Sequence, residues 1–239
     1  MILLAVDTAT QTGSVALLRD GRLAGVISTM SDEAYSSRFF RQLEFLLHEM
    51  RLQVQEVDVF AVAAGPGSFT GLRVGLTAVK AWGEVFSKPI IAVSGLEAIA
   101  AQARILDENA LIAPMLDARR GQVFAALYKR DGSQLIVQGD EQVCTAEEFI
   151  ASLAARAPGR FIYFVSPTPE ILQSEFAKPH VGGSASGVLP TIQEASPLLA
   201  PIIGQLAFGR ATRGEFTDAL RLDANYIRRS DAELLWKKA

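Results

Sequence analysis

The chain has 239 residues, of which 49% are hydrophobic, and its formal net charge at pH 7 is −3. This length suits one large domain or two modest ones, with enough apolar residues for a sizeable core. A protein that grips nucleic acid unaided usually carries a basic excess, so this charge argues against that class.

The first residues, MILLAVDTAT, hold a short apolar run that Asp7 interrupts and that no basic region precedes. A signal peptide needs both a basic start and a longer apolar segment. Elsewhere no apolar stretch approaches the roughly 20 residues that cross a bilayer. We therefore expect a cytoplasmic protein without membrane contact, and the single cysteine, Cys144, excludes an intramolecular disulfide.

The opening of the chain has the pattern of an antiparallel meander. Residues 2–6 form a continuous apolar run typical of a buried strand, and residues 8–12 form a polar turn. Residues 13–18 and 22–28 are strand-like on either side of Asp20-Gly21. This dipeptide favours a hairpin because both of its positions accept positive φ.

Helices and strands then alternate along the chain. A helix capped by Ser31 or Asp32 should run to Met50, and a second helix should end near Ser87. The remaining expected elements are strands at 57–64 and 90–93 and a helix over 96–106. Strands separated by helices pair in parallel, so the first hundred residues should be α/β.

A second unit repeats this organisation. Residues 110–116 suit a strand, Asp117 opens a turn, and strands at 122–129 and 134–142 flank Asp131-Gly132, another hairpin signal. The repeat predicts a duplicated α/β fold with two domains, each a mixed sheet flanked by helices. The actin-like ATPase superfamily, which includes sugar kinases and Hsp70-like proteins, has this architecture.

The expected domains are residues 1–106, completed by the C-terminal tail 214–239, and a more divergent domain over 107–213. Within the second domain we expect a helix at 145–156, a strand at 161–165 and a loop over 166–190. A further helix is expected over 196–212, with Pro197 near its first turn, where proline is tolerated, and with the less favourable Pro201 as an alternative start.

A glycine-rich turn joins a strand to a helix in AVAAGPGSFTGLRVGLTAVKAWGEVF, residues 61–86. A P-loop needs a second glycine and a lysine where Thr70 and Gly71 stand, and the dinucleotide fingerprint needs a glycine at Thr70. Both nucleotide motifs are therefore weak. Gly71 and Gly75 share one helix face, so we expect them to let another backbone approach closely.

The helices at 32–50 and 69–87 carry more apolar residues than one buried stripe requires. Apolar faces that stay exposed mark interaction sites, whereas the alternative is that the second domain or the tail covers them. The predicted partner interface comprises Tyr35, Phe39, Phe40, Leu43, Leu46, Leu47, Gly71, Leu72, Gly75, Leu76, Val79 and Phe86.

Candidates for chemistry are few. Asp7 ends a buried strand beside Thr8, and Asp117 occupies the matching place in the second unit. In an ATPase of this fold such carboxylates handle metal-bound phosphate; the alternative is that they cap turns. The two histidines, His48 and His180, have no paired zinc-binding spacing, and no catalytic set is recognisable.

Three segments resemble the TsaB family, in order and in spacing over about residues 1–130: MILLAVDTATQTGSVALL, AVAAGPGSFTGLRVGLTAVKAW and APMLDARRGQVFAALY. The family's C-terminal Pro-Leu-Tyr-Leu-Arg motif stands here as Ala224-Asn225-Tyr226-Ile227-Arg228. The resemblance implies an actin-like fold and a role in making threonylcarbamoyl adenosine in tRNA.

The resemblance also implies partners. In that family TsaB pairs with TsaD, the metal-binding paralogue that transfers the threonylcarbamoyl group, and a small ATPase, TsaE, completes the set. It implies a homodimer when the chain is alone, tRNA contact only through the complex, and dimers joined through the two helices above. The His-x-x-x-His metal motif of TsaD is missing, since the nearby positions are Ser36, Ser37 and Phe40.

We therefore expect a pseudoenzyme that stabilises or activates TsaD, without catalytic residues or metal ligands of its own. We assign no cofactor to the chain by itself, and the partner interface is where ATP or ADP could be accommodated. The alternative is an ATP-dependent kinase or ATPase that uses Asp7 and Asp117. A stand-alone peptidase has no metal triad or Ser–His pair to support it.

Overall fold

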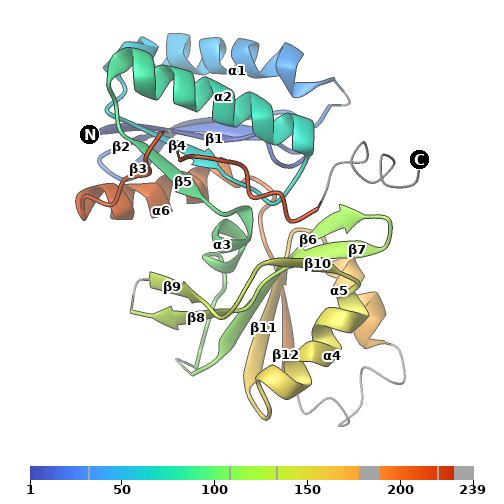
Figure 1. The fold of residues 1–239 in the computed structure, drawn as a ribbon. Coiled ribbons are helices and arrows are strands. Elements are labelled where there is room, and N and C mark those ends of the chain that lie inside the picture. The colour runs from blue at the N-terminus through green and yellow to red at the C-terminus, as the bar shows by residue number, and fades with distance from the viewer. Residues whose placement is uncertain (32, 108, 133, 178–188, 220, 229–239) are drawn as a thin grey trace. The chain divides into compact units, whose positions relative to one another are not determined.

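The computed structural model describes residues 1–31, 33–107, 109–132, 134–177, 189–219 and 221–228 (Figure 1). It divides into two units: one comprises Met1–Ala98 with the chain from Leu198 onward, and the other comprises Ile99–Pro197.

The first unit is built on a sheet with the strand order β3-β2-β1-β4-β5. β1 (Ile2–Asp7) pairs antiparallel with β2 (Ser14–Arg19) and parallel with β4 (Val59–Ala63). β3 (Arg22–Ser28) and β5 (Ile90–Val93) form the two edges. The predicted hairpin is confirmed, because Asp20 and Gly21 have φ values of 49° and 76°.

Helices cover both faces of this sheet (Figure 1). α1 (Tyr35–Glu49) and α2 (Phe69–Phe86) lie side by side on one face, with the short helix η1 (Val54–Glu56) beside α2, and α6 (Ala200–Thr212) packs on the other face. The Ser68 hydroxyl caps α2 by accepting a hydrogen bond from Gly71 N at 3.2 Å. α6 begins at Ala200 and not at Ser196, so Pro201 lies in its first turn and the alternative start is the correct one.

The second unit repeats the topology with the order β10-β7-β6-β11-β12. β6 (Leu111–Arg119) pairs antiparallel with β7 (Gln122–Ala125) and parallel with β11 (Phe161–Ser166), as β1 does with β2 and β4. β10 (Gln142–Cys144) and β12 (Leu189–Glu194) are the edges. α4 (Ala146–Arg156) and α5 (Pro169–Phe176) pack on this sheet, and Phe149, Ile150 and Leu153 of α4 enter its core.

Several predicted elements of the second unit need correction. The predicted strand 122–129 is two strands, β7 and β8 (Tyr128–Asp131), and β8 pairs with β9 (Gln134–Val137) as an inserted hairpin. The predicted loop 166–190 contains α5 and the start of β12, while residues 178–188 lie outside the described part of the chain. The helix expected over 96–106 is α3 (Gly95–Ala100), which ends earlier.

The predicted domain boundary at 213 differs from these units, because α6 packs against β1, β2, β4 and β5 of the first unit. The tail after α6 runs back along the same unit. Thr217 N donates to Ile90 O at 2.7 Å, at the free edge of β5, and Asn225 N donates to Ala64 O at 2.7 Å. Lys80 Nζ of α2 donates a hydrogen bond to the Leu222 carbonyl at 2.5 Å, so the tail links α2 to the edge of the sheet.

The glycine face of α2 packs directly on the turn that follows β1. A Cβ on Gly71 would overlap the backbone oxygen of Thr8, and a Cβ on Gly75 would lie 2.5 Å from the Thr8 hydroxyl. That hydroxyl instead donates to the Gly71 carbonyl at 2.7 Å. The glycines therefore allow the close packing that the sequence predicts, and the backbone that approaches them is the first turn.

We expect Gly71→Ala to lower the free energy of unfolding by about 2–3 kcal/mol, because the added methyl meets backbone that cannot swing away. Gly209→Ala in α6 is the matched control: its Cβ meets only the flexible tip of Arg213, at 3.5 Å. That change should be neutral or stabilise by up to about 1 kcal/mol through helix propensity. Urea denaturation of both variants checks this, and equal stabilities would contradict it.

Candidate functional site

Most of the predicted partner interface faces inward. Seven apolar residues of the predicted interface are almost fully buried within the first unit: Phe39, Leu43, Leu46, Leu47, Leu72, Leu76 and Val79. Gly71 and Gly75 are buried as well. These side chains pack on the chain's own sheet and between α1 and α2, as when the Phe39 ring stacks on Trp82 at 6.2 Å. They are core residues of the first unit, although Leu43 and Leu47 also line a surface hollow, so burial argues against direct partner contact for the others and not for these two.

An apolar surface nevertheless remains on the outer side of the helix pair. Phe40 and Phe45 of α1 are 51% and 58% exposed, and Val85 of α2 is 73% exposed. Tyr35 and Phe86 from the predicted set are half-buried. We call Phe40, Phe45 and Val85 the outer apolar surface. The predicted interface included Phe40 but not Phe45. Hydrophobic periodicity does not show which side of a helix is covered by the neighbouring helix.

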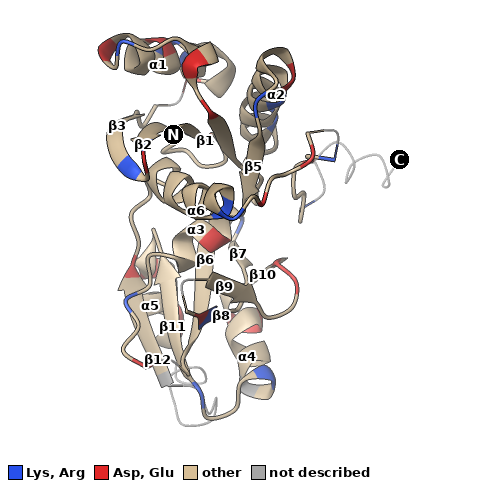
Figure 2. Cartoon of the chain, turned by 90° about the vertical axis from the view of Figure 1, so that its left-hand side faces the viewer, with Lys and Arg blue, Asp and Glu red and all other residues tan. Residues whose placement is uncertain are grey.

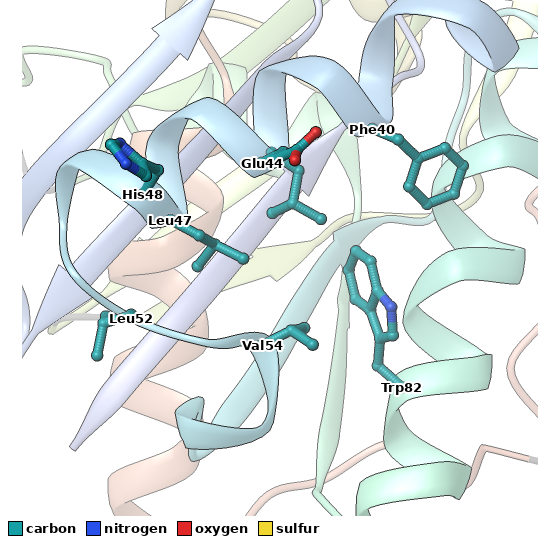
Figure 3. A pocket seen from close by; sticks show the side chains of 8 residues that line it. Phe40, Glu44, Leu47, His48, Leu52, Val54 and Trp82 are labelled. Carbon is teal, nitrogen blue, oxygen red and sulfur yellow. The ribbon is translucent and has the colours of Figure 1, made fainter.

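A hollow of about 510 Å³ opens beside Phe40, between α1, the segment around η1, and α2 (Figure 3). Phe40, Leu47 and Trp82 form its apolar wall, while Glu44 and His48 lie on the α1 side. Leu43, Leu52 and Val54 complete the lining. It is therefore an apolar hollow with a few polar groups at its edge, the general character of a ligand pocket.

The inner side of α1 carries a polar stripe that sequence reasoning missed. Tyr35 Oη donates to the carbonyl of Thr10 at 2.7 Å, and Arg38 Nη2 donates to the carbonyl of Gln11 at 3.0 Å. Gln42 Nε2 donates to the Thr29 hydroxyl. Arg38 and Gln42 are buried, although their types predict exposure. The spacing of positions 35, 38 and 42, three and four residues apart, was the available signal.

Asp7 lies at the end of β1 with none of its surface exposed. Its carboxylate accepts hydrogen bonds from Ala9 N at 2.8 Å and from the Thr10 hydroxyl at 3.3 Å. Burial raises the pKa of Asp7 to about 6, against the lowering effect of these two bonds. Thr8 is buried beside it against α2. Asp7 and Thr8 thus cap and pack the turn.

Asp117 holds the equivalent place in the second unit and is exposed. Its carboxylate accepts a hydrogen bond from Arg119 N at 2.7 Å, the same two-residue reach that Asp7 makes to Ala9. Among the described residues, no three or more His, Cys, Asp or Glu side chains group as a metal site. His48 is exposed on α1, and His180 lies outside the described residues.

Comparison with known proteins places this geometry in a family. The family model described as "TsaD: tRNA N6-adenosine threonylcarbamoyltransferase" matches residues 15–191. The chain belongs to this family. Within it, the chain is 38% identical over 148 residues to the tRNA threonylcarbamoyladenosine biosynthesis protein TsaB of Bacillus subtilis (strain 168). That match covers 62% of this chain and spans 64% of the relative, somewhat less than two thirds of its length.

Solved structures show the same fold. YeaZ from Pseudomonas aeruginosa is 26% identical, with a TM-score of 0.72 over 94% of this chain and 99% of that one. A ROK family protein from Streptococcus pneumoniae TIGR4 is 11% identical, with a TM-score of 0.50 over 90% of this chain and 100% of that one, and shares the fold alone. The predicted duplicated actin-like architecture and the resemblance to TsaB are confirmed.

The charge pattern of α1 and the hydropathy of the described helices are two further properties of the chain. Acidic and basic residues both occur along α1, so the helix has no single sign of charge (Figure 2). In the ranges that the structure describes, no helix has the length and apolar character that a membrane crossing requires.

We expect Asp7 to make the protein less stable as pH rises. Between about pH 4 and pH 6 the folded chain keeps a proton on Asp7 that the unfolded chain has lost, since the folded pKa is about 6. A difference of roughly two pKa units corresponds to about 3 kcal/mol. Asp7→Asn should therefore gain stability relative to the wild type as pH rises through this window.

Asp117→Asn is the matched control, because it changes an exposed carboxylate that makes the equivalent turn contact. Urea denaturation of both variants and the wild type at pH 4, 5, 6 and 7 gives the comparison. Parallel pH profiles for Asp7→Asn and the wild type would show that the buried carboxyl is not protonated in this window.

Proposed function

We propose that the chain is a non-catalytic subunit in the synthesis of threonylcarbamoyl adenosine in tRNA, and that it stabilises or activates a TsaD-type transferase by pairing with it. The observation that carries the proposal is the likeness to TsaB, named as a biosynthesis protein for this nucleoside, in a chain that keeps exposed aromatic residues on α1. A TsaE-type ATPase would complete the complex, and the chain would form a homodimer when alone.

The outer apolar surface supports a protein partner. Large aromatic side chains that stay half exposed on a well-packed helix cost free energy in water, and such residues often dominate a binding interface. Phe40 borders the hollow that Trp82 and Leu47 line, so a partner side chain that enters it would be surrounded by apolar atoms. Contact with tRNA would run through the complex, consistent with the net charge of −3.

The geometry favours this proposal over an ATP-dependent enzyme. That alternative asks Asp7 to handle metal-bound phosphate, yet its carboxylate is fully buried and is bonded to Ala9 N and the Thr10 hydroxyl. A carboxylate that is enclosed and hydrogen-bonded by its own turn is a poor partner for a cation. The turn that touches phosphate in ATPases of this fold is here packed against the glycines of α2.

Phe40→Asp and Phe45→Asp should each weaken association with the TsaD homologue of the same organism by about 10-fold or more, since each places a charge in a desolvated interface. Both side chains are exposed, so the variants should fold. Leu106→Asp is the matched control, because Leu106 is 95% exposed and lies in the second unit. Titration calorimetry of the purified pair measures the affinities, and three equal values would remove the helix pair as the interface.

We expect the chain alone to bind Mg-ATP weakly, with an affinity that Asp7→Asn leaves unchanged, because the Asp7 carboxylate is enclosed by its own turn. Calorimetry with ATP and magnesium provides the measurement. Tight binding that Asp7→Asn abolishes would instead support the kinase or ATPase alternative.

A further inference from the structure

The turn 8–13 is held by its carbonyl groups, and the donors come from three different elements. Ser68 N at the start of α2 donates to Ala9 O at 2.8 Å. Tyr35 and Arg38 of α1 reach the carbonyls of Thr10 and Gln11. On the other side, the Ser28 hydroxyl of β3 lies 2.9 Å from Thr12 O and 3.0 Å from Gly13 O. Every carbonyl from residue 9 to residue 13 therefore lies within hydrogen-bond distance of a donor from outside the turn, and the single protons of the Tyr35 and Ser28 hydroxyls are each shared between two of them.

Arg38 has an unusual environment for a cation. It is 3% exposed, its guanidinium lies 4.1 Å from the Tyr35 ring centre, and its hydrogen-bond acceptors are the carbonyls of Gln11 and Thr29 and the Thr29 hydroxyl. Among the described residues no carboxylate pairs with it, and its Nε has no acceptor. Burying a charge without a counter-ion costs free energy. Arg38 therefore depends on the carbonyls of Gln11 and Thr29 for the polar contacts that offset this cost.

The clearance between α1 and the turn is small. A Cβ on Gly13 would overlap the Tyr35 hydroxyl, so the Tyr35 side chain lies directly against the backbone there. Closely packed elements transmit small shifts because there is no free volume to absorb them. A movement of α1 must therefore move the turn or break the bonds from Tyr35 and Arg38.

The outer apolar surface lies on the same two helices. Phe40 and Phe45 face outward on α1, Val85 faces outward on α2, and the inward sides of α1 and of the start of α2 hold the turn. We propose that partner docking on the outer apolar surface and ordering of the turn 8–13 are one coupled equilibrium, with Arg38 and Tyr35 as the positioning residues that join them. This inference rests on the proposed function.

Coupling of this kind is reciprocal, so it has two measurable effects, one on the turn and one on partner affinity. Binding of the TsaD homologue should slow hydrogen exchange at the amides of residues 9–13 by about 10-fold or more, although the partner sits on the other side of the helices. In return, Arg38→Met should weaken partner binding by about 10-fold while Phe40 and Phe45 are unchanged. The readouts are hydrogen-exchange mass spectrometry of the free chain and the complex, and calorimetry.

Arg41→Met is the matched control, because Arg41 lies on the same helix with a 65% exposed side chain in a surface ion pair with Glu33. It should leave both the exchange at 9–13 and the affinity unchanged. Tyr35→Phe is a second variant that keeps the ring under Arg38 but removes the hydroxyl. It should speed exchange at 9–13 and lower affinity even if Arg38→Met fails to fold.

The possible outcomes separate this inference from the proposed function. A complex that forms with unchanged exchange at 9–13 overturns the coupling and leaves the proposed function standing. Wild-type affinity in Tyr35→Phe also overturns it. Failure of the wild-type chain to associate with the TsaD homologue overturns both.

Discussion

The close approach of α2 to the first turn is the constraint on which the rest of the first unit depends. It requires a helix face without side chains, which Gly71 and Gly75 provide, and it is fixed by the bond from the Thr8 hydroxyl to Gly71 O. With α2 in this place, Asp7 is enclosed beneath the turn and α1 lies alongside α2. One contact therefore accounts both for the glycines of α2 and for the way two helices share one face of the sheet.

The duplicated fold could be predicted because the signals at which its strands and turns begin and end are local in the sequence. The hairpin at Asp20-Gly21 and the buried runs of β1 and β4 follow from chemistry that acts within a few residues. The helix and strand missed within the predicted loop 166–190 reflect proline. Pro169 opens α5, where a first turn tolerates it, and Pro190 lies in β12, an edge strand where the missing N–H is tolerated. The sequence therefore predicts a loop for both segments.

The candidate site was harder to predict, since it depends on which helix flanks are covered. Phe39 and Phe40 are adjacent and equally apolar, yet one is core and the other is half exposed, because only Phe39 points between α2 and the sheet. Arg38 and Gln42 show the converse. Polar residues on a helix are assigned to solvent by pattern. Only the three-dimensional structure shows that the Gln11 carbonyl lies within reach of Arg38 and the Thr29 hydroxyl within reach of Gln42.

The two units differ in how the chain composes them. The second unit is one continuous segment, Ile99–Pro197, whereas the first needs α6 and the tail, which come last. During translation, β1, β2, β4 and β5 therefore leave the ribosome with one face uncovered, and they stay so until Ala200–Thr212 has emerged. The later-synthesised unit therefore has all its parts before the first unit does, and the face of the nascent sheet that α6 covers stays exposed to water for that time.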